Sequence, residues 1–260
     1  MDLGLDDDVA LTLASSAGLG GASAESLARE GAHVTICGRD PDRLAAAESE
    51  LEALGSGDVL ALQADVTDPD DVERLVAETV EAFGGLDHLV TSAGGPPPGS
   101  VLDLGDDDWY AAYDLLVMSV VRAVRAAHPH LADGGGTIAC IASRTVREAS
   151  DDLVLSNAVR RGVVGLVKTV SREFAPAVRT NAVLPGPFET SRIEGLVEHR
   201  VEAGEYESYA DGLAGFADDV PVGRVGDPRE LGDTVAFLAS ERAGFVNEVS
   251  LPVDGGALRS

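Results

Sequence analysis

The sequence predicts an α/β fold, with a mostly parallel sheet of seven strands and helices on both faces. Two observations support this prediction. Short runs rich in Val, Ile and Leu alternate with helix-like stretches along most of the chain, which is the pattern of parallel strands joined by crossover helices. The first apolar run leads into a turn containing glycine and then an alanine-rich stretch, as in folds that bind nucleotides. We therefore expect a single doubly wound domain of the Rossmann type over residues 1–260.

Seven apolar runs are assigned as strands, because each is short and is bounded by turn residues. They are Val9–Ala14, His33–Cys37, Val59–Gln63, His88–Thr91, Thr137–Ala142, Thr180–Leu184 and Glu248–Pro252.

Helices are expected between these strands, and several carry clear start and stop signals. Asp40-Pro41, Asp68-Pro69 and Asp227-Pro228 each offer an N-cap carboxylate followed by proline at the first helical position. Gly31 and Gly84 stand where helix C-termini are expected. Residues 188–220 interrupt the alternation with an acidic stretch, which by itself indicates a helical excursion on the surface.

The charge of the chain is extreme. Nineteen basic residues face 45 acidic ones, the net charge is −26, and Lys168 is the only lysine. Such a surface repels nucleic acid and anionic membranes. The acidic residues are scattered along the chain, which favours adaptation to a salt-rich cytoplasm over binding of a cationic partner. We therefore expect a halophilic protein of archaeal origin.

Other features narrow the class of protein. No run of eighteen apolar residues exists, so no membrane span is expected. The acidic start at residues 1–8 lacks the pattern of a signal peptide, which predicts a cytoplasmic protein. Cys37 and Cys140 lie in apolar runs and are interpreted as buried thiols. We expect a small-molecule substrate and no metal site.

The turn after the first strand is the first candidate cofactor site. Its backbone N–H groups and the following helix N-terminus suit a pyrophosphate, and the residues assigned to it are Ser15, Ser16, Gly18, Leu19 and Gly20. The second strand ends in Gly38-Arg39. A carboxylate at position 38 would bind the ribose 2′-hydroxyl, whereas glycine followed by arginine suits a 2′-phosphate. The alternative is a solvated arginine on a turn, but we expect NADP(H) to be favoured over NAD(H).

A serine at Ser143 is followed thirteen residues later by Ser156 and then by Arg160. With the glycine turn, the segment after the fourth strand and the segment from Pro185 to Thr190, this arrangement resembles the short-chain dehydrogenase/reductase family over nearly the whole chain. The resemblance implies further cofactor contacts from Asp65, Val66, Ser92, Ala93, Gly94, Arg160, Pro185, Gly186, Phe188 and Thr190. It also implies that residues 188–220 form a substrate lid. A homo-oligomer, a dimer or tetramer built on the helices after the fourth and fifth strands, is implied as well.

The catalytic positions depart from the family pattern, which is Ser, then Tyr-x-x-x-Lys, with an Asn on an earlier helix. Ser143 matches the serine, but Ser156 stands for the tyrosine, Arg160 for the lysine and Leu116 for the asparagine. Serine is a much weaker acid than tyrosine, and arginine cannot pass a proton on. The candidate catalytic residues are therefore Ser143, Ser156 and Arg160. The tyrosines lie elsewhere, at Tyr110, Tyr113, Tyr206 and Tyr209.

Two functions remain open. The leading hypothesis is an NAD(P)(H)-dependent oxidoreductase acting on a carbonyl or alcohol, similar to 3-oxoacyl reductases or sugar and alcohol dehydrogenases, with a proton relayed by water through Ser143 and Ser156. The alternative is an NADP-binding partner or sensor protein without turnover. Arg160 also resembles the arginine of halohydrin dehalogenases, but those relatives keep the tyrosine.

Overall fold

The computed structural model describes residues 2–202 and 204–259, with a seven-stranded sheet at the centre. The strand order is β3-β2-β1-β4-β5-β6-β7, and every pair of neighbours is parallel. The strands are β1 (Val9–Thr12), β2 (His33–Gly38), β3 (Val59–Gln63), β4 (His88–Thr91), β5 (Thr137–Ile141), β6 (Arg179–Pro185) and β7 (Ser250–Val253). The predicted Rossmann-type α/β fold is confirmed.

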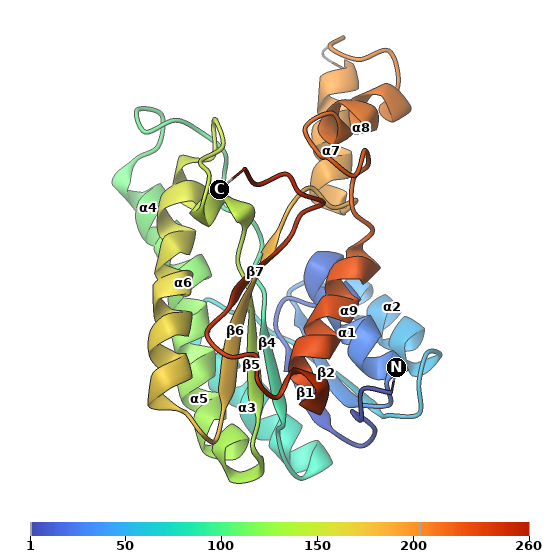
Figure 1. Cartoon of the computed structure of the whole chain (residues 1–260), viewed down its shortest axis with the longest axis vertical. Coiled ribbons are helices and arrows are strands. Elements are labelled where there is room, and N and C mark those ends of the chain that lie inside the picture. Colours follow the sequence, from blue (N-terminus) through green and yellow to red (C-terminus); the bar gives the residue numbers. More distant parts are fainter. Residues whose placement is uncertain (1, 203, 260) are drawn as a thin grey trace.

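Helices cover both faces of the sheet (Figure 1). One apolar core joins the sheet to α1 (Gly18–Arg29), α2 (Pro41–Glu52) and α9 (Pro228–Ala239). The other joins it to α3 (Pro69–Phe83), α5 (Ser119–Gly134) and α6 (Val154–Glu173). Within the described residues, no helix combines the length and the apolar character that crossing a bilayer requires.

The predicted helix signals are confirmed. The carboxylates of Asp40, Asp68 and Asp227 each accept hydrogen bonds from backbone amides in the first turn of α2, α3 and α9. Gly84 ends α3 with a φ of 84°, and Gly31, with a φ of 91°, follows the C-cap of α1. Both angles lie in the left-handed region that glycine adopts without strain.

Two strand ends differ from the prediction by two residues, and the other differences are of one residue. β1 ends at Thr12 instead of Ala14, because Ala14 has a φ of 48° and turns the chain away from the sheet toward α1. β7 starts at Ser250 instead of Glu248, which has a φ of 67°. Such angles are incompatible with an extended strand, and apolar character alone does not reveal them.

The interruption expected at residues 188–220 contains α7 (Ser191–Glu202) and α8 (Tyr209–Ala217). In Figure 1 these helices stand apart from the layered part of the molecule, beyond the sheet. Between β4 and α6 the chain also forms α4 (Asp106–Tyr113), a π-helical turn η1 (Asp114–Met118) and a 3-10 helix η2 (Arg144–Val146). A further 3-10 helix, η3 (Glu241–Ala243), precedes β7.

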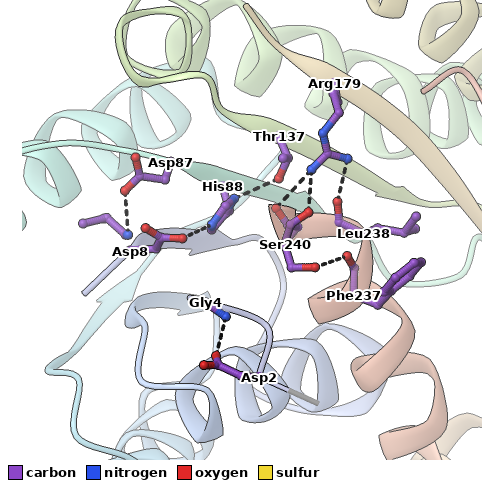
Figure 2. Close-up of polar contacts among 12 residues, drawn as sticks. Asp2, Gly4, Asp8, Asp87, His88, Thr137, Arg179, Phe237, Leu238 and Ser240 are labelled. Carbon is purple, nitrogen blue, oxygen red and sulfur yellow. Dashed lines mark hydrogen bonds and ion pairs between the residues drawn. The ribbon is translucent and has the colours of Figure 1, made fainter. Parts of the chain in front are cut away.

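A polar network ties together the amino ends of the central strands (Figure 2). The buried ring of His88 contacts Asp8 through Nε2 at 3.0 Å and Thr137 through Nδ1 at 2.9 Å. The half-buried guanidinium of Arg179 donates four hydrogen bonds to carbonyl oxygens around the C-terminus of α9, those of Leu238, Ala239, Ser240 and Val246. The bonds to Leu238 and Ala239 satisfy the last carbonyls of α9, which have no other partner among the described residues.

Candidate functional site

A cavity of about 400 Å³ opens at the carboxyl ends of the strands. Its wall is made by the segments that follow β1, β4, β5 and β6, by the start of α6 and by part of the region between β6 and α9. Parallel strands bring their carboxyl ends to one edge, where ligands bind in open α/β sheets. The cavity therefore gathers segments that are far apart in the sequence.

The glycine turn forms one wall and fits a pyrophosphate. α1 begins at Gly18 with Ala17 as its N-cap, no side chain caps it, and its first turn holds no acidic residue. The amide groups of that turn are thus left to an anion. A Cβ at Gly20 would lie 2.6 Å from the carbonyl oxygen of Ala14, so only glycine permits this turn. Gly18, Leu19 and Gly20 all line the cavity.

The two serines of the turn have different positions. Ser15 is buried, and its hydroxyl donates to the Thr12 carbonyl and accepts from the Cys37 amide. Its own amide donates to the Cys37 carbonyl, so the amide and hydroxyl of Ser15 join β1 to β2. Ser16 lies against the end of β2, where a Cβ at Gly38 would be 2.5 Å from its Oγ.

Arg39, Asp65 and Val66 follow β2 and β3 and lie outside the cavity. The Arg39 side chain is 79% exposed, and its Nη1 is 3.9 Å from Asp65 Oδ2. Partial burial raises the pKa of Asp65, but hydrogen bonds from the Thr67 amide and hydroxyl and the charge of Arg39 outweigh it and hold this pKa below its usual value. Val66 is buried in the core.

The predicted cofactor residues near the far side of the site do line the cavity: Ser92, Ala93, Gly94, Pro185, Gly186, Phe188 and Thr190. The first three follow β4, and the last four lie at the end of β6 and beyond it. The Thr190 hydroxyl donates to the Phe188 carbonyl at 3.4 Å.

Three hydroxyl groups form a connected chain at the end of β5. Ser143 Oγ accepts hydrogen bonds from the amide of Thr145 at 3.2 Å and from its Oγ1 at 3.1 Å. Thr145 Oγ1 is also 3.3 Å from Ser156 Oγ. Because the Thr145 proton is directed to Ser143, Ser156 is the donor in the second contact. The Ser143 proton then points away from both and is left for a ligand in the cavity.

Arg160 lies behind this chain on α6. It is 9% exposed and donates to the Ala142 carbonyl at 3.2 Å and to the Gly94 carbonyl at 3.3 Å. These bonds join the segments after β4 and β5. The structure thus brings Ser143, Ser156 and Arg160 together on one cavity wall, as the sequence analysis expected.

Leu116 is 2% exposed and packs in the core, within the π-helical turn η1. Tyr110 and Tyr113 are 71% and 51% exposed on α4. None of the four tyrosines is among the described residues that line the cavity.

Among the lining residues that the sequence analysis missed, two bear on the chemistry: Arg144, which lines the cavity beside Ser143, and Thr145. Both directly follow the end of β5, the place where functional residues of parallel sheets collect. Their position immediately after Ser143 was a signal that could have identified them.

Metal and thiol chemistry receive no support from the described residues. Among them, no group of three or more His, Cys, Asp or Glu side chains is placed to hold a metal ion. Cys37 and Cys140 are buried free thiols, and burial raises the pKa of each to about 11. Both are therefore protonated near neutral pH, which agrees with their interpretation as core residues.

Comparison with known proteins gives consistent matches over the whole chain. Residues 13–257 match the family described as enoyl-(acyl carrier protein) reductase. Glucose 1-dehydrogenase of Gluconobacter oxydans is 32% identical over 95% of this chain and 90% of its own length. A putative ketoacyl reductase for granaticin in Streptomyces violaceoruber is 34% identical over 95% and 92%. L-sorbose reductase of Gluconobacter frateurii, solved with NADPH and L-sorbose, superposes with a TM-score of 0.96 at 31% identity over 100% of both chains.

Proposed function

This chain belongs to the short-chain dehydrogenase/reductase family of NAD(P)-dependent oxidoreductases, and from that premise we propose that it uses NADP(H) to interconvert a carbonyl and a hydroxyl group on a small polar substrate. One observation carries the proposal. A single cavity joins the uncapped N-terminus of α1 to the hydroxyls of Ser143 and Ser156. Bound NADPH would supply the hydride, and the residues of this chain would supply orientation and the proton.

The three-hydroxyl chain defines how the proton would move. Ser143 donates to the carbonyl oxygen of the substrate, because its own Oγ already accepts two hydrogen bonds from Thr145. As negative charge develops on that oxygen, Ser143 gives its proton to it. Ser143 then takes a proton from Thr145, and Thr145 takes one from Ser156. Solvent refills Ser156. The guanidinium of Arg160 stays protonated and stabilises the developing charge without itself transferring a proton.

The relay is tested by removing its central hydroxyl. Thr145→Val should lower kcat by about a hundredfold, the lower range for loss of a general acid, while leaving NADPH affinity unchanged. Thr145→Ser is the matched control, because it keeps the hydroxyl, and it should retain most of the activity. Equal activity of the Val and Ser variants would refute the relay.

The preference for NADP(H) rests on the end of β2. Arg39 is the exposed cation at that strand end and its present partner, Asp65, is distant. A 2′-phosphate would replace that weak contact with charge-assisted hydrogen bonds. Arg39→Ala should weaken NADPH binding by about tenfold or more and leave NADH binding unchanged. Arg43→Ala removes a similarly exposed arginine on α2 and serves as the control.

A carboxylate at position 38 should reverse the preference. Its Cβ would clash with Ser16 Oγ, so Gly38→Asp should be combined with Ser16→Gly. This double variant should bind NADH more tightly than NADPH. If the unaltered protein binds both cofactors equally, the role assigned to Arg39 is wrong.

A second candidate is an NADP-binding partner or sensor without turnover. One observation favours it: the buried Leu116 stands where the family pattern has an amide, Ser156 where it has a phenol, and Arg160 where it has an amine. The two functions differ in one measurement. Under the enzymatic proposal, purified protein oxidises NADPH in the presence of a panel of sugars and ketones. Tight NADPH binding with no turnover across the panel would favour the sensor.

We further propose a salt-adapted homo-oligomer, a dimer or tetramer, in which residues 188–220 act as a substrate lid within one domain. The scattered acidic surface supports salt adaptation. Exposed apolar side chains at Val101, Leu102 and Tyr110, which are 59%, 93% and 71% exposed, support an interface near α4. Light scattering in molar KCl measures the oligomeric state, and a monomer at all concentrations would refute the interface.

A further inference from the structure

The charges that line the cavity differ sharply from those of the rest of the molecule. Acidic residues make up 45 of the 260 in the chain. Among the described residues that line the cavity, however, there is no Asp or Glu, and the charged side chains are those of Arg144 and Arg160. The phosphates of NADPH would account for this at the α1 end of the cavity, but Arg144 lies beside Ser143, where the substrate would react.

The guanidinium of Arg160 donates hydrogen bonds to two backbone carbonyl groups and so helps to hold the structure together. Arg144 makes no such bonds among the described residues. In the described part of the chain, the guanidinium of Arg144 forms no hydrogen bond and no ion pair. Arg125 and Arg161 also lack such partners there, but both are exposed, whereas Arg144 is half-buried. A cation that has lost part of its hydration without gaining a partner is costly, which indicates that a ligand provides the partner.

We propose that the substrate carries an anionic group, a carboxylate or a phosphate, which Arg144 binds. This inference rests on the proposed function of the same cavity and names its substrate class. Arg144 directly follows Ser143, the residue that orients the reacting oxygen, and it lines the same cavity together with Ser150, Leu153 and Ser156. The anionic group therefore lies only a few bonds from the reacting carbon, as in a short hydroxy acid, an oxo acid or a small sugar phosphate. Arginine presents paired donors that match both groups.

The test compares charged ligands with neutral ones of the same shape. Calorimetric titrations use 3-hydroxybutyrate against 3-hydroxybutyramide and glycerol 3-phosphate against glycerol, each with and without saturating NADP⁺ at a fixed KCl concentration. The anionic member of at least one pair should bind about ten- to a hundredfold more tightly, as charge-assisted hydrogen bonds predict. The pair with the larger ratio identifies carboxylate or phosphate as the group.

Variants test whether Arg144 causes the tighter binding of the anionic ligand. Arg144→Gln should reduce it to about threefold or less, and Arg144→Lys should retain part of it, because lysine keeps the charge but loses the paired geometry. Arg161→Gln removes the same charge from an exposed position on α6 and should leave the ratio unchanged.

The affinity for NADPH, measured separately, distinguishes failure of this inference from failure of the proposed function. Equal binding of the charged and neutral members by the unaltered protein overturns the inference, whether or not NADPH binds. A ratio that survives in Arg144→Gln also overturns it. A ratio that disappears in Arg144→Gln supports the inference even if turnover is never detected.

Discussion

Restoring a phenol at position 156 should convert this site into a faster reductase of ordinary ketones. Ser156 lies on the wall of a cavity of about 400 Å³, so an aromatic ring has space to extend toward the substrate. A phenol ionises near pH 10, far more readily than a serine hydroxyl, and a well-placed general acid contributes about 10²- to 10⁴-fold to a rate. We therefore expect Ser156→Tyr with Arg160→Lys to raise kcat/KM on simple ketones by about a hundredfold.

A third substitution, Leu116→Asn, carries a risk to folding. Leu116 is 2% exposed, and placing an amide there would cost about 1–3 kcal/mol unless water hydrates it. Leu116→Asn should therefore be added only after the double variant has been shown to fold.

The assay follows the absorbance of NADPH during reduction of a ketone series. The matched control is Ser156→Phe with Arg160→Lys, which adds the same ring without the hydroxyl and should give no gain. Adding Ser143→Ala to the Tyr variant should abolish the gain. Equal rates for the Tyr and Phe variants would refute the reasoning, as would fast ketone reduction by the unaltered protein that survives Ser156→Ala.

Four further outcomes are expected. Arg179→Met removes four hydrogen bonds at the end of α9 and should cost about 3 kcal/mol, lowering Tm by about 6–12 °C; the exposed Arg242→Met should have little effect on calorimetric Tm. Gly20→Ala should abolish NADPH binding in a fluorescence titration, since its Cβ would meet the Ala14 carbonyl at 2.6 Å. Tm should rise steadily from about 0.1 M to several molar KCl, as screening weakens carboxylate repulsion, and a flat curve would contradict salt adaptation. Hydrogen bonds from Arg224 and from the Asp227 amide lower the pKa of Glu230 from 4.5 to about 2, so this carboxylate stabilises the fold above its unfolded pKa and loses that effect as the pH falls toward 2. Glu230→Gln should lower Tm at neutral pH, and the difference should shrink as the pH falls from 4.5 toward 2.

The parts of the fold that were predictable depend on interactions within a few residues. Asp40-Pro41 begins a helix because a carboxylate and a ring placed side by side satisfy the first turn, and no distant residue is needed. The end of β1 depended instead on the φ angle of Ala14, which the apolar pattern does not reveal, so the predicted strand was too long.

Roles within the site were harder to predict, because they depend on where each side chain points and on which group donates each hydrogen bond. The sequence analysis placed Ser15 and Ser16 together at the cofactor, but the Ser15 hydroxyl bonds to β1 and β2. Thr145 was overlooked because its importance comes from a contact with Ser156 on another element. A linear pattern identified which segments meet at the cavity, but not which hydroxyl donates to which.

The absence of carboxylates from the described cavity wall has a kinetic consequence. A phosphorylated cofactor that approaches a chain of net charge −26 meets repulsion over the whole Debye length, about 30 Å at 0.01 M salt and about 3 Å at 1 M. Within the acid-free opening, the charged side chains among the described lining residues are those of Arg144 and Arg160. Encounter with NADPH should therefore accelerate as salt is added, the reverse of ordinary electrostatic steering. Salt concentration would then set how fast this protein is loaded with its cofactor.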